Sequence, residues 1–493
     1  MEFISGADRQ QMILLPDCVD DYIGEENAVR VIDAYVNSLD LQALGFSRPK
    51  PRDTGRPIYN PKDLLKLYIY GYMNRVRSSR RLETETKRNL EVVWLLGKLS
   101  PDHKTIATFR HDNTAALKNV FRDFVRLCVK LGLYGRELIA IDGSKFKAVN
   151  AQDRNFCEKK LQYRIARIEA RIEEYLLELE DSDSEDVAAE GEKSSEEIAG
   201  IIVALEQRKE RYQGYIQELA QTGESQKSLT DPDSRRMLSN GKMDICYNVQ
   251  TAVDSAHKLV AEFEVTNDAF DINKITPMVE RTKETLQAQQ FSAVMDAGYD
   301  SVQDIVASMS QGIDVHVAGV DFDICIPAEE PSNAEITAHK DGRCVYFADR
   351  NLTLCPMGKV LQPRFYKRNR YGGFGVFFNY GVCKQCTCKC TKEARGRRYQ
   401  VLMPQSSFSK AYNDDNLHIR QTRIAPDSKR IQQRKCIVEH PFGTVKRSMD
   451  AGYCLTRGLQ NVSGEFSLAS LAYKFKRVIN ILGAQKLIEC IAA

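Results

Sequence analysis

Three acidic residues far apart in the chain are the strongest candidates for chemistry. Asp142 stands in the apolar stretch ELIAIDGSKFKAVN, which is typical of a buried strand, and Asp296 follows the apolar stretch FSAVM. Glu439 lies in the helix-compatible segment IVEHPFGTVKR. A buried carboxylate costs free energy unless it is paired or bound to a metal ion. The three acids are therefore candidate site residues, provided that the fold brings them together.

Grouped carboxylates predict a bound cation, because their negative charges otherwise repel one another. Carboxylate oxygens are hard ligands, which Mg²⁺ and Mn²⁺ prefer. Two such ions about 4 Å apart can activate water or a 3′-hydroxyl group and stabilise the leaving oxygen during in-line attack on a phosphodiester. We therefore expect Asp142, Asp296 and Glu439 to bind two Mg²⁺ or Mn²⁺ ions.

The elements that must position these acids have the expected order strand, strand, strand, helix, strand. After the strand of Asp142, the segments ICYNVQTAVDSA and KLVAEFEVTN predict a hairpin, and INKITPMVERTKETLQ predicts a helix before the strand that ends at Asp296. A later helix-like stretch carries Glu439. The fold that unites acids from two strands and a helix is the ribonuclease-H-like (RNase H-like) fold, a mixed sheet with flanking helices. The ranges assigned to this α+β catalytic core are 136–156, 240–320 and 411–493.

Composition and charge indicate a soluble protein with a polyanionic partner. The chain has 493 residues, 43% apolar and 28% charged, which suffices for several domains. The N-terminal residues do not resemble a secretory signal, and no apolar run approaches the ~18 residues of a membrane helix. We expect a cytoplasmic protein without membrane contacts. The net charge of +3 hides two basic regions, 47–89 and 359–410, and an acidic region, 173–197, which favours a polyanion over plain solvated faces.

Residues 1–135 predict a helical, basic domain that binds DNA. Segments such as PKDLLKLYIYGYM are typical of helices, and the connection NRVRSSRRLETETKRN mixes arginines with short hydroxyl side chains. Cations and hydroxyl groups are the groups that contact phosphates. A plain helical bundle with a basic face is the alternative. The predicted DNA contacts in this region are Arg75, Arg77, Arg80 and Arg81.

The region 157–239 is a predicted insertion into the core. It holds two amphipathic Leu/Ile stripes joined by an acidic, polar stretch. This pattern is typical of a coiled-coil-like helical hairpin, packed on itself or paired with a copy of itself. Its acidity argues against contact with DNA.

The region 321–410 is a second predicted insertion, basic and rich in cysteine, with strands and loops. Its cysteines indicate a structural zinc site, because four thiolates complete tetrahedral coordination. Cys344 and Cys388 compete as ligands, and ordinary reduced cysteines are the alternative. The ligands chosen are Cys355, Cys383, Cys386 and Cys390.

These segments together resemble the DDE-type bacterial insertion-sequence transposases, in the branch named for insertion sequence 1182. The matching stretches span nearly the whole chain in order: IAIDGSKFKA, TDPDSRRM, YNVQTAVD, VMDAGYDS, CPMG with CKQC, VEHPFGTVKR and RGLQNVSGEF. The resemblance implies cut-and-paste transposition, with cleavage at the terminal inverted repeats of a DNA element and strand transfer into target DNA. It also implies a catalytic triad of Asp142, Asp296 and Glu439. Because two DNA ends must be held together, we expect a homodimer in a paired-end complex, associated with the nucleoid when bound to DNA.

Related transposases often carry the signature Tyr-x₂-Arg-x₃-Glu-x₆-Lys around the last acid. Glu439 and Lys446 fit this register, whereas Lys435 stands at the Arg position and Gln432 at the Tyr position. Lys446, Lys435 and Arg447 are predicted to contact DNA phosphates.

Other residues near the expected site receive more modest roles. Pro441 removes a backbone donor, so we expect a kink or a helix start just after Glu439. His440 is interpreted as a packing or supporting residue, with direct contact to DNA or metal as the alternative. The remaining acids near the strands fall at loop positions and are interpreted as turn and cap residues, although one could assist metal binding; they are Asp254, Asp268 and Asp271.

Two other functions stay open at this point. One is a non-catalytic DNA-binding protein derived from such a transposase, and the other is an RNase H-like nuclease with another role. Metal-dependent cleavage separates the first from a transposase, and dependence of that cleavage on terminal repeats separates the second.

Overall fold

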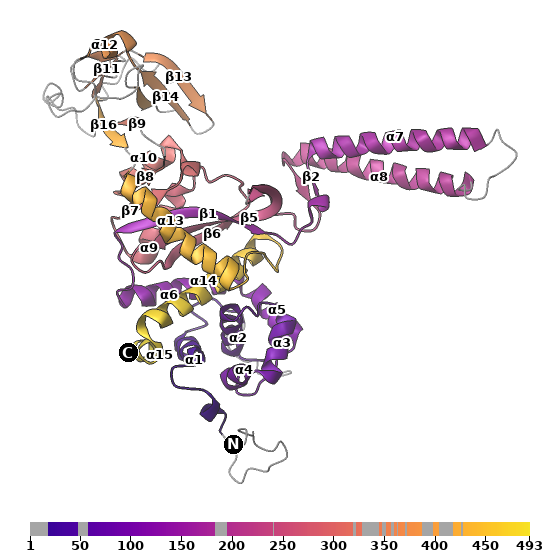
Figure 1. The fold of residues 1–493 in the computed structure, drawn as a ribbon, viewed down its shortest axis with the longest axis vertical. Helices are drawn as coiled ribbons and strands as arrows, with labels where there is room; N and C mark the ends of the chain where they lie inside the picture. Colours follow the sequence, from indigo (N-terminus) through magenta and orange to yellow (C-terminus); the bar gives the residue numbers. More distant parts are fainter. Residues whose placement is uncertain are drawn as a thin grey trace, which may run out of the picture.

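A computed structural model of the chain contains an N-terminal helical region, a mixed sheet with flanking helices, a projecting helical hairpin and a second sheet (Figure 1). The residues that the structure describes are 18–47, 58–182, 195–239, 241–318, 322–327, 345–347, 352–355, 359–361, 363–369, 372–386, 398–403, 418–424 and 427–493.

Polar caps and apolar faces define the N-terminal helices. Asn27, Asn60, Asn89 and Asp102 each begin a helix by accepting a hydrogen bond from the backbone N–H two residues further on. Pro61 takes the first position of its helix, where its missing N–H has no cost. The elements of this region are η1 (Val19–Tyr22), α1 (Ala28–Ser38), α2 (Pro61–Met73), α3 (Ser79–Arg88), α4 (Leu90–Leu95), α5 (His103–Asp112) and α6 (Thr114–Lys130).

The main sheet has six strands and mixed direction. Its order is β4-β5-β1-β7-β8, and β6 also pairs with β5. β1 is antiparallel to β5 but parallel to β7, and β7 is parallel to β8. The side chains of β5, β6 and β7 are largely buried, as expected for strands covered on both faces, whereas those of β4 are mostly not. They are β1 (Leu138–Lys147), β4 (Arg235–Ser239), β5 (Lys242–Asp254), β6 (Val260–Thr266), β7 (Ser292–Met295) and β8 (Asp314–Val317).

One hydrophobic core joins the sheet to the N-terminal helices. The long helix α14 (Leu459–Leu482) lies between them and contacts both β6 and α6 (Figure 1). Phe475 of α14 stacks on Phe124 of α6, and Phe466 of α14 packs edge-on against Phe263 of β6. The N-terminal region is therefore not a separately packed domain. The helices α9 (Ile275–Leu286), α10 (Val302–Ser310) and α13 (Ser428–Gly443) flank the sheet, and α15 (Ala484–Ala492) packs against α1 and α14.

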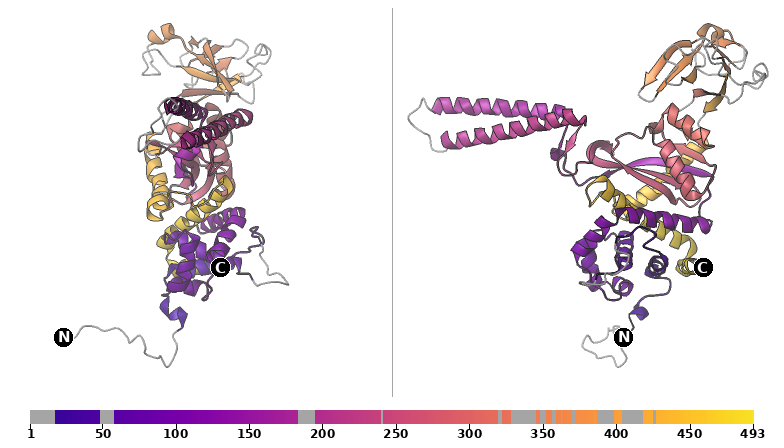
Figure 2. Two further views of the ribbon diagram at one scale, coloured as in Figure 1. Left: turned by 90° about the vertical axis from the view of Figure 1, so that its right-hand side faces the viewer. Right: turned by 180° about the vertical axis from the view of Figure 1, so that it is seen from behind.

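Two structures project from this body, as Figure 2 also shows from behind. The first is the hairpin of α7 (Glu158–Ser182) and α8 (Ser195–Thr222), which starts from the short strands β2 (Asn155–Phe156) and β3 (Lys227–Ser228).

No helix in the described part of the chain is long and apolar enough to cross a membrane.

The second projecting structure is an eight-stranded sheet of order β12-β11-β10-β16-β9-β15-β14-β13. Its elements are β9 (Phe322–Pro327), β10 (Val345–Phe347), β11 (Leu352–Leu354), β12 (Val360–Leu361), β13 (Pro363–Asn369), β14 (Gly372–Phe377), α12 (Tyr380–Lys384), β15 (Tyr399–Met403) and β16 (His418–Ile424).

Two strands pair with a different part of the fold from the one to which our predicted domain ranges assigned them. β16 falls in the range 411–493 that we assigned to the core, yet its backbone pairs with β9 and β10 of the second sheet. β4 falls in the range 157–239 that we assigned to the hairpin, yet it pairs with β5 of the main sheet. The partner of β16 is distant in sequence, whereas β4 forms a hairpin with the next strand, β5.

The helix around Glu439 neither starts nor stops there. α13 runs through Pro441 to Gly443, which differs from the helix start that we considered. The irregularity instead follows as a π-helical turn, η6 (Thr444–Ser448). A proline removes one helical hydrogen bond, and the wider turn that follows is closed by a backbone hydrogen bond from Met449 N–H to Thr444 O.

The packing of α14 on α6 generates a stability prediction. An added Cβ at Gly464 would lie 2.9 Å from Thr114 Cγ2 and 3.0 Å from Thr114 Cβ. We expect Gly464→Ala to lower the free energy of unfolding by about 1–3 kcal/mol through overpacking, measured by chemical denaturation. Gly200→Ala in α8 is the matched control, because nothing lies within 4 Å of its added Cβ. A Gly464→Ala variant as stable as the wild type would contradict this packing.

Candidate active site

Asp142 lies on the central strand β1, directly after a buried apolar run. Its side chain is 19% exposed. Oδ1 accepts a hydrogen bond from Gly143 N–H at 2.9 Å, and Oδ2 accepts one from Arg434 Nη1 of α13 at 2.7 Å. The strand therefore presents a carboxylate that is mostly removed from water and held by one cation.

Burial raises the pKa of Asp142 to about 6, against the opposing effect of the Arg434 guanidinium. Negative charge on Asp296 and Asp271 raises this pKa further. Below about pH 6 the carboxyl group is therefore mostly protonated and a poor metal ligand.

Asp296 follows the neighbouring strand β7 and caps the short turn η3 (Ala297–Tyr299). Its Oδ1 accepts a hydrogen bond from Gly298 N–H at 2.9 Å. Ala140 of β1 is level with Val294 of β7 in the parallel register, so each acid stands two residues beyond a paired position. β7 ends at Met295 whereas β1 continues to Lys147, so Asp142 and Asp296 lie at one level, just beyond the last β1–β7 pair, which we call their shared edge.

Glu439 lies on α13, which packs against β1 and β7, but its side chain is exposed. No group of three or more His, Cys, Asp or Glu side chains able to hold a metal ion occurs among the described residues. The strand register brings Asp142 and Asp296 together, while the place of Glu439 in the triad stays a prediction.

Two cations of the C-terminal segment contact β1. Arg434 binds Asp142, while Lys446 Nζ donates hydrogen bonds to Ser144 Oγ and Lys145 O, each at 2.7 Å. Burial lowers the pKa of Lys446 to about 8. Lys446 is thus held against the strand instead of projecting as a free phosphate contact. Lys435, at the signature position, is exposed, and sequence reasoning missed the adjacent Arg434.

His440 makes a packing contact. Its Nδ1 lies 2.9 Å from the Tyr473 hydroxyl of α14, which itself donates to Lys258 O. Burial lowers the pKa of His440. The histidine therefore joins α13 to α14 through a buried hydroxyl group.

The predicted DNA-contacting arginines fall into two groups. Arg77 is 4% exposed and donates to Glu465 Oε1 at 3.1 Å and to Tyr453 O at 2.8 Å. Its prediction as a phosphate contact is therefore corrected, because its charge is already paired inside the protein. Arg75 is exposed and donates to Ser448 O next to η6. The side chains that stay exposed without such contacts are Arg80, Arg81 and Arg447.

The predicted zinc ligands are only partly within the described residues. Cys355 is buried and lies beside Lys359 N–H at 3.4 Å, Cys383 lies on α12, and Cys386 follows that helix. Cys390 lies outside the described residues, as do the competing Cys344 and Cys388. The zinc site stays a prediction.

Asp271 is one of the three acids that we interpreted as turn and cap residues, with assistance in metal binding left open for one of them. It belongs to the segment between β6 and α9, and its carboxylate lies against Gly143 of β1 and near Gly298, which follows Asp296. The glycines that follow each predicted acid, in DG and DAG, were the available signal for a close approach of another group.

Two family models match the chain, one near each end. Residues 17–112 match a transposase domain (DUF772), and residues 354–479 match a transposase DDE domain, a range that includes Arg434, Glu439 and Lys446. Both matches support function as a DNA transposase of the DDE type. No curated protein matches the chain.

A solved structure of the piggyBac transposase synaptic complex with hairpin DNA is also similar, at 7% identity. The match covers 94% of this chain and 79% of that one, but its TM-score of 0.30 is too low to carry an argument about the fold.

The ion pair between Arg434 and Asp142 generates an electrostatic prediction. We expect Arg434→Met to raise the pKa of Asp142 above about 6, because burial and carboxylate repulsion remain while the opposing charge is lost. The titration midpoint of the Asp142 carboxyl ¹³C signal in metal-free protein measures this shift. Arg430→Met is the control, since Arg430 lies on the same helix but pairs with Asp314. An unchanged or lower midpoint for Arg434→Met would contradict the assignment.

Proposed function

We propose that this protein is a cut-and-paste DNA transposase of the insertion sequence 1182 branch. It cleaves DNA at the terminal inverted repeats of its element and transfers the freed strands to target DNA. The observation that carries this proposal is the parallel pairing of β1 with β7, which gives Asp142 and Asp296 one shared sheet edge. The two transposase models that match the chain support the general function.

The catalytic core is proposed to be RNase H-like. The strand series β6-β5-β1-β7-β8, antiparallel across its first three strands and parallel from β1 to β8, supports this fold. In such a core the helical hairpin interrupts the connection from β1 to β5. The second sheet, with its zinc site, interrupts the connection from β8 to α13.

Asp142, Asp296 and Glu439 are proposed to hold two Mg²⁺ or Mn²⁺ ions. The donor set fits this use, because Asp142 and Asp296 are hard oxygen ligands on one edge, and their mutual repulsion favours a bound cation. Bound there, divalent ions supply Lewis-acid activation of the attacking and leaving oxygens. Glu439 lies in sequence between Arg434 of α13 and Lys446 of η6, which both contact β1, and this supports its inclusion in the triad.

The protein's own groups prepare this site in definable ways. Arg434 opposes the rise in the pKa of Asp142, which favours the ionised ligand near neutral pH. Lys446 fixes the end of α13 to Ser144 and Lys145. Arg75 and Arg77 join the turn between α2 and α3 to the segment after α13, through Ser448 O and Tyr453 O.

DNA binding is proposed for the exposed basic side chains around this junction. Arg80, Arg81 and Arg447 are exposed, and Lys435 is exposed on α13. The contact of Arg75 with Ser448 brings the two basic segments together, which would let one DNA end touch both. The protein then acts in the cytoplasm and associates with the nucleoid when bound to DNA.

A homodimer is proposed because two element ends must react together. The hairpin supports this role through exposed large apolar side chains, which are Tyr163, Leu176, Leu177 and Val203.

A non-catalytic DNA-binding protein is the second candidate function. The exposure of Glu439 and the absence of a three-ligand group among the described residues favour it. The cleavage experiment below separates the two candidates.

The catalytic proposal predicts loss of DNA cleavage without loss of DNA binding. With Mg²⁺ and DNA that carries the element ends, Asp142→Asn, Asp296→Asn and Glu439→Gln should each lower the cleavage rate by more than about 100-fold, beyond the loss typical of an outer-shell change. Asp300→Asn is the matched control, being an exposed acid four residues after Asp296. Wild-type binding with no metal-dependent cleavage would favour the second candidate, and cleavage by Asp142→Asn at the wild-type rate would contradict the proposed triad.

The DNA-binding surface predicts a salt-dependent affinity. Each lost phosphate contact should reduce the slope of log K against log salt by about 0.9. We expect the double variant Arg80→Gln, Arg81→Gln to lower both this slope and the affinity for element ends, measured by fluorescence anisotropy. Arg77→Gln should lower thermal stability instead, because it leaves Glu465 buried without its ion pair. An unchanged slope in the double variant would show that these arginines do not contact phosphates.

A further inference from the structure

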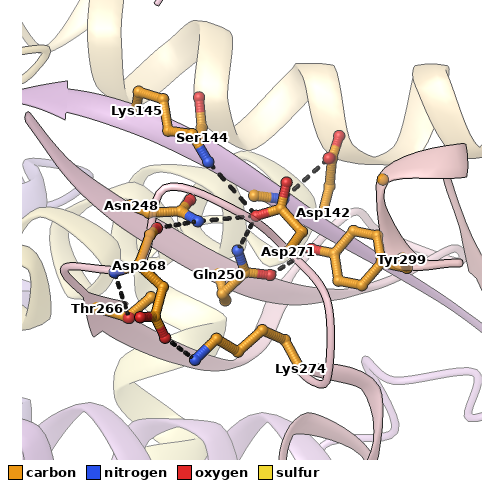
Figure 3. A network of polar contacts seen from close by, with 12 residues as sticks. Asp142, Ser144, Lys145, Asn248, Gln250, Thr266, Asp268, Asp271, Lys274 and Tyr299 are labelled. Atoms are coloured by element: carbon orange, nitrogen blue, oxygen red, sulfur yellow. Dashed lines mark hydrogen bonds and ion pairs between the residues drawn. The ribbon is translucent and has the colours of Figure 1, made fainter. Parts of the chain in front are cut away.

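Asp271 lies beside the two strand acids and is not part of the triad. Figure 3 shows its carboxylate among side chains from β1 and β5, with Asp142 and Tyr299 nearby. Asp271 itself comes from the segment between β6 and α9. A loop thus inserts an acid between strands whose other side chains converge on it.

Three donors hold one oxygen of this carboxylate. Asp271 Oδ1 accepts hydrogen bonds from Asn248 Nδ2 at 2.7 Å, Gln250 Nε2 at 2.6 Å and Lys145 Nζ at 3.4 Å. The Tyr299 hydroxyl donates to Gln250 Oε1 and thereby turns the amide N–H toward Asp271. The orientation of Asp271 is therefore determined by groups from β1 and β5.

The second oxygen of Asp271 lies beside Gly298, as does one oxygen of Asp296. The Cβ position built on Gly298 lies 3.5 Å from Asp271 Oδ2 and 3.0 Å from Asp296 Oδ1. No described residue donates a hydrogen bond to Asp271 Oδ2, since the donors to Asp271 all bind Oδ1. Two carboxylate oxygens thus face one small volume beside a glycine.

The glycine after Asp142 is required for this arrangement. A Cβ on Gly143 would lie 2.6 Å from Asp271 Oδ1 and 2.5 Å from Gln250 Nε2, closer than real contacts allow. The same Cβ position lies 3.0 Å from Asn248 Oδ1. That oxygen has no hydrogen-bond partner in the described structure, although Asn248 is fully buried. A buried acceptor without a donor is costly and indicates that a further group belongs at this site.

The negative charges at this site also indicate that a further group belongs there. Asp296 and Asp271 both lie near enough to Asp142 for their negative charges to act on its carboxyl group. The cations in contact with this group are Arg434 at Asp142 and Lys145 at Asp271. Carboxylates brought together in this way are stabilised by a divalent cation, which prefers such oxygen ligands.

We propose that Asp271 is a further metal-ligating residue of this site, presenting Oδ2 to a divalent cation that it shares with Asp296. This inference rests on the proposed metal-dependent function. It replaces our interpretation of Asp271 as a turn residue and gives the loop before α9 a part in forming the site. Gln250 acts as a positioning residue, because it reaches the cation only through Asp271.

Binding of Mn²⁺ to the full-length protein without DNA tests the proposal independently of activity. Free Mn²⁺ is followed by electron paramagnetic resonance during titration. Asp271→Asn keeps an oxygen that can accept from the three donors but removes the charge, so we expect the Mn²⁺ affinity to fall about 10-fold or more. Asp268→Asn is the matched control, since this acid lies in the same loop and pairs with Lys274.

The outcomes separate this inference from the proposed function. If the wild-type protein bound no Mn²⁺ in the site, its titration would be identical to that of Asp296→Asn. This result would overturn both the proposed metal-dependent function and the role of Asp271. Loss of binding in Asp296→Asn together with wild-type affinity in Asp271→Asn would overturn only the role of Asp271.

A measurement on the unaltered protein covers the case in which Asp271→Asn does not fold. Fe²⁺ substituted for the cation and treated with ascorbate and peroxide cuts the backbone near its ligands. We expect cleavage of the chain close to Asp271 as well as close to Asp296, and competition of both cuts by excess Mn²⁺. Cuts near Asp296 without any near Asp271 would contradict the proposal.

Discussion

The parallel pairing of β1 with β7 is the constraint on which the site depends. It places Asp142 and Asp296 at one edge of the sheet, in surroundings that raise the pKa of Asp142 to about 6. Because the backbone holds these like charges together, cations must neutralise them. Arg434 forms an ion pair with Asp142, and the glycines that follow both acids leave room for Asp271. The charge distribution of the site follows from this register.

The rest of the molecule is attached to that edge through shared packing. α14 forms one core with the sheet and the N-terminal helices, while Arg434 of α13 and Lys446 of η6 both contact β1. The turn between α2 and α3 is tied to the segment after α13 by Arg75 and Arg77. A basic N-terminal region and an acidic sheet edge are thereby built as one unit, as cleavage of bound DNA requires.

Local patterns in the sequence predicted the helices and strands better than they predicted the contacts between them. The apolar runs before Asp142 and Asp296 predicted strands, but which strands pair, and in which direction, depends on packing between distant segments. Arg434 was overlooked in favour of Lys435, because a signature register does not show which side of a helix meets the sheet. Arg77 looked like a phosphate contact because its partner, Glu465, is far away in sequence. Asp271 looked like a turn residue because its donors come from β1 and β5.

The central claim is that the edge shared by Asp142 and Asp296 binds the catalytic cation. Anomalous scattering from crystals of the protein grown with DNA ends and Mn²⁺ tests it most directly. The account predicts a Mn²⁺ peak at ligand distance from both carboxylates. Anomalous peaks confined to other parts of the protein, in crystals whose protein cleaves DNA with Mn²⁺ in solution, would contradict it.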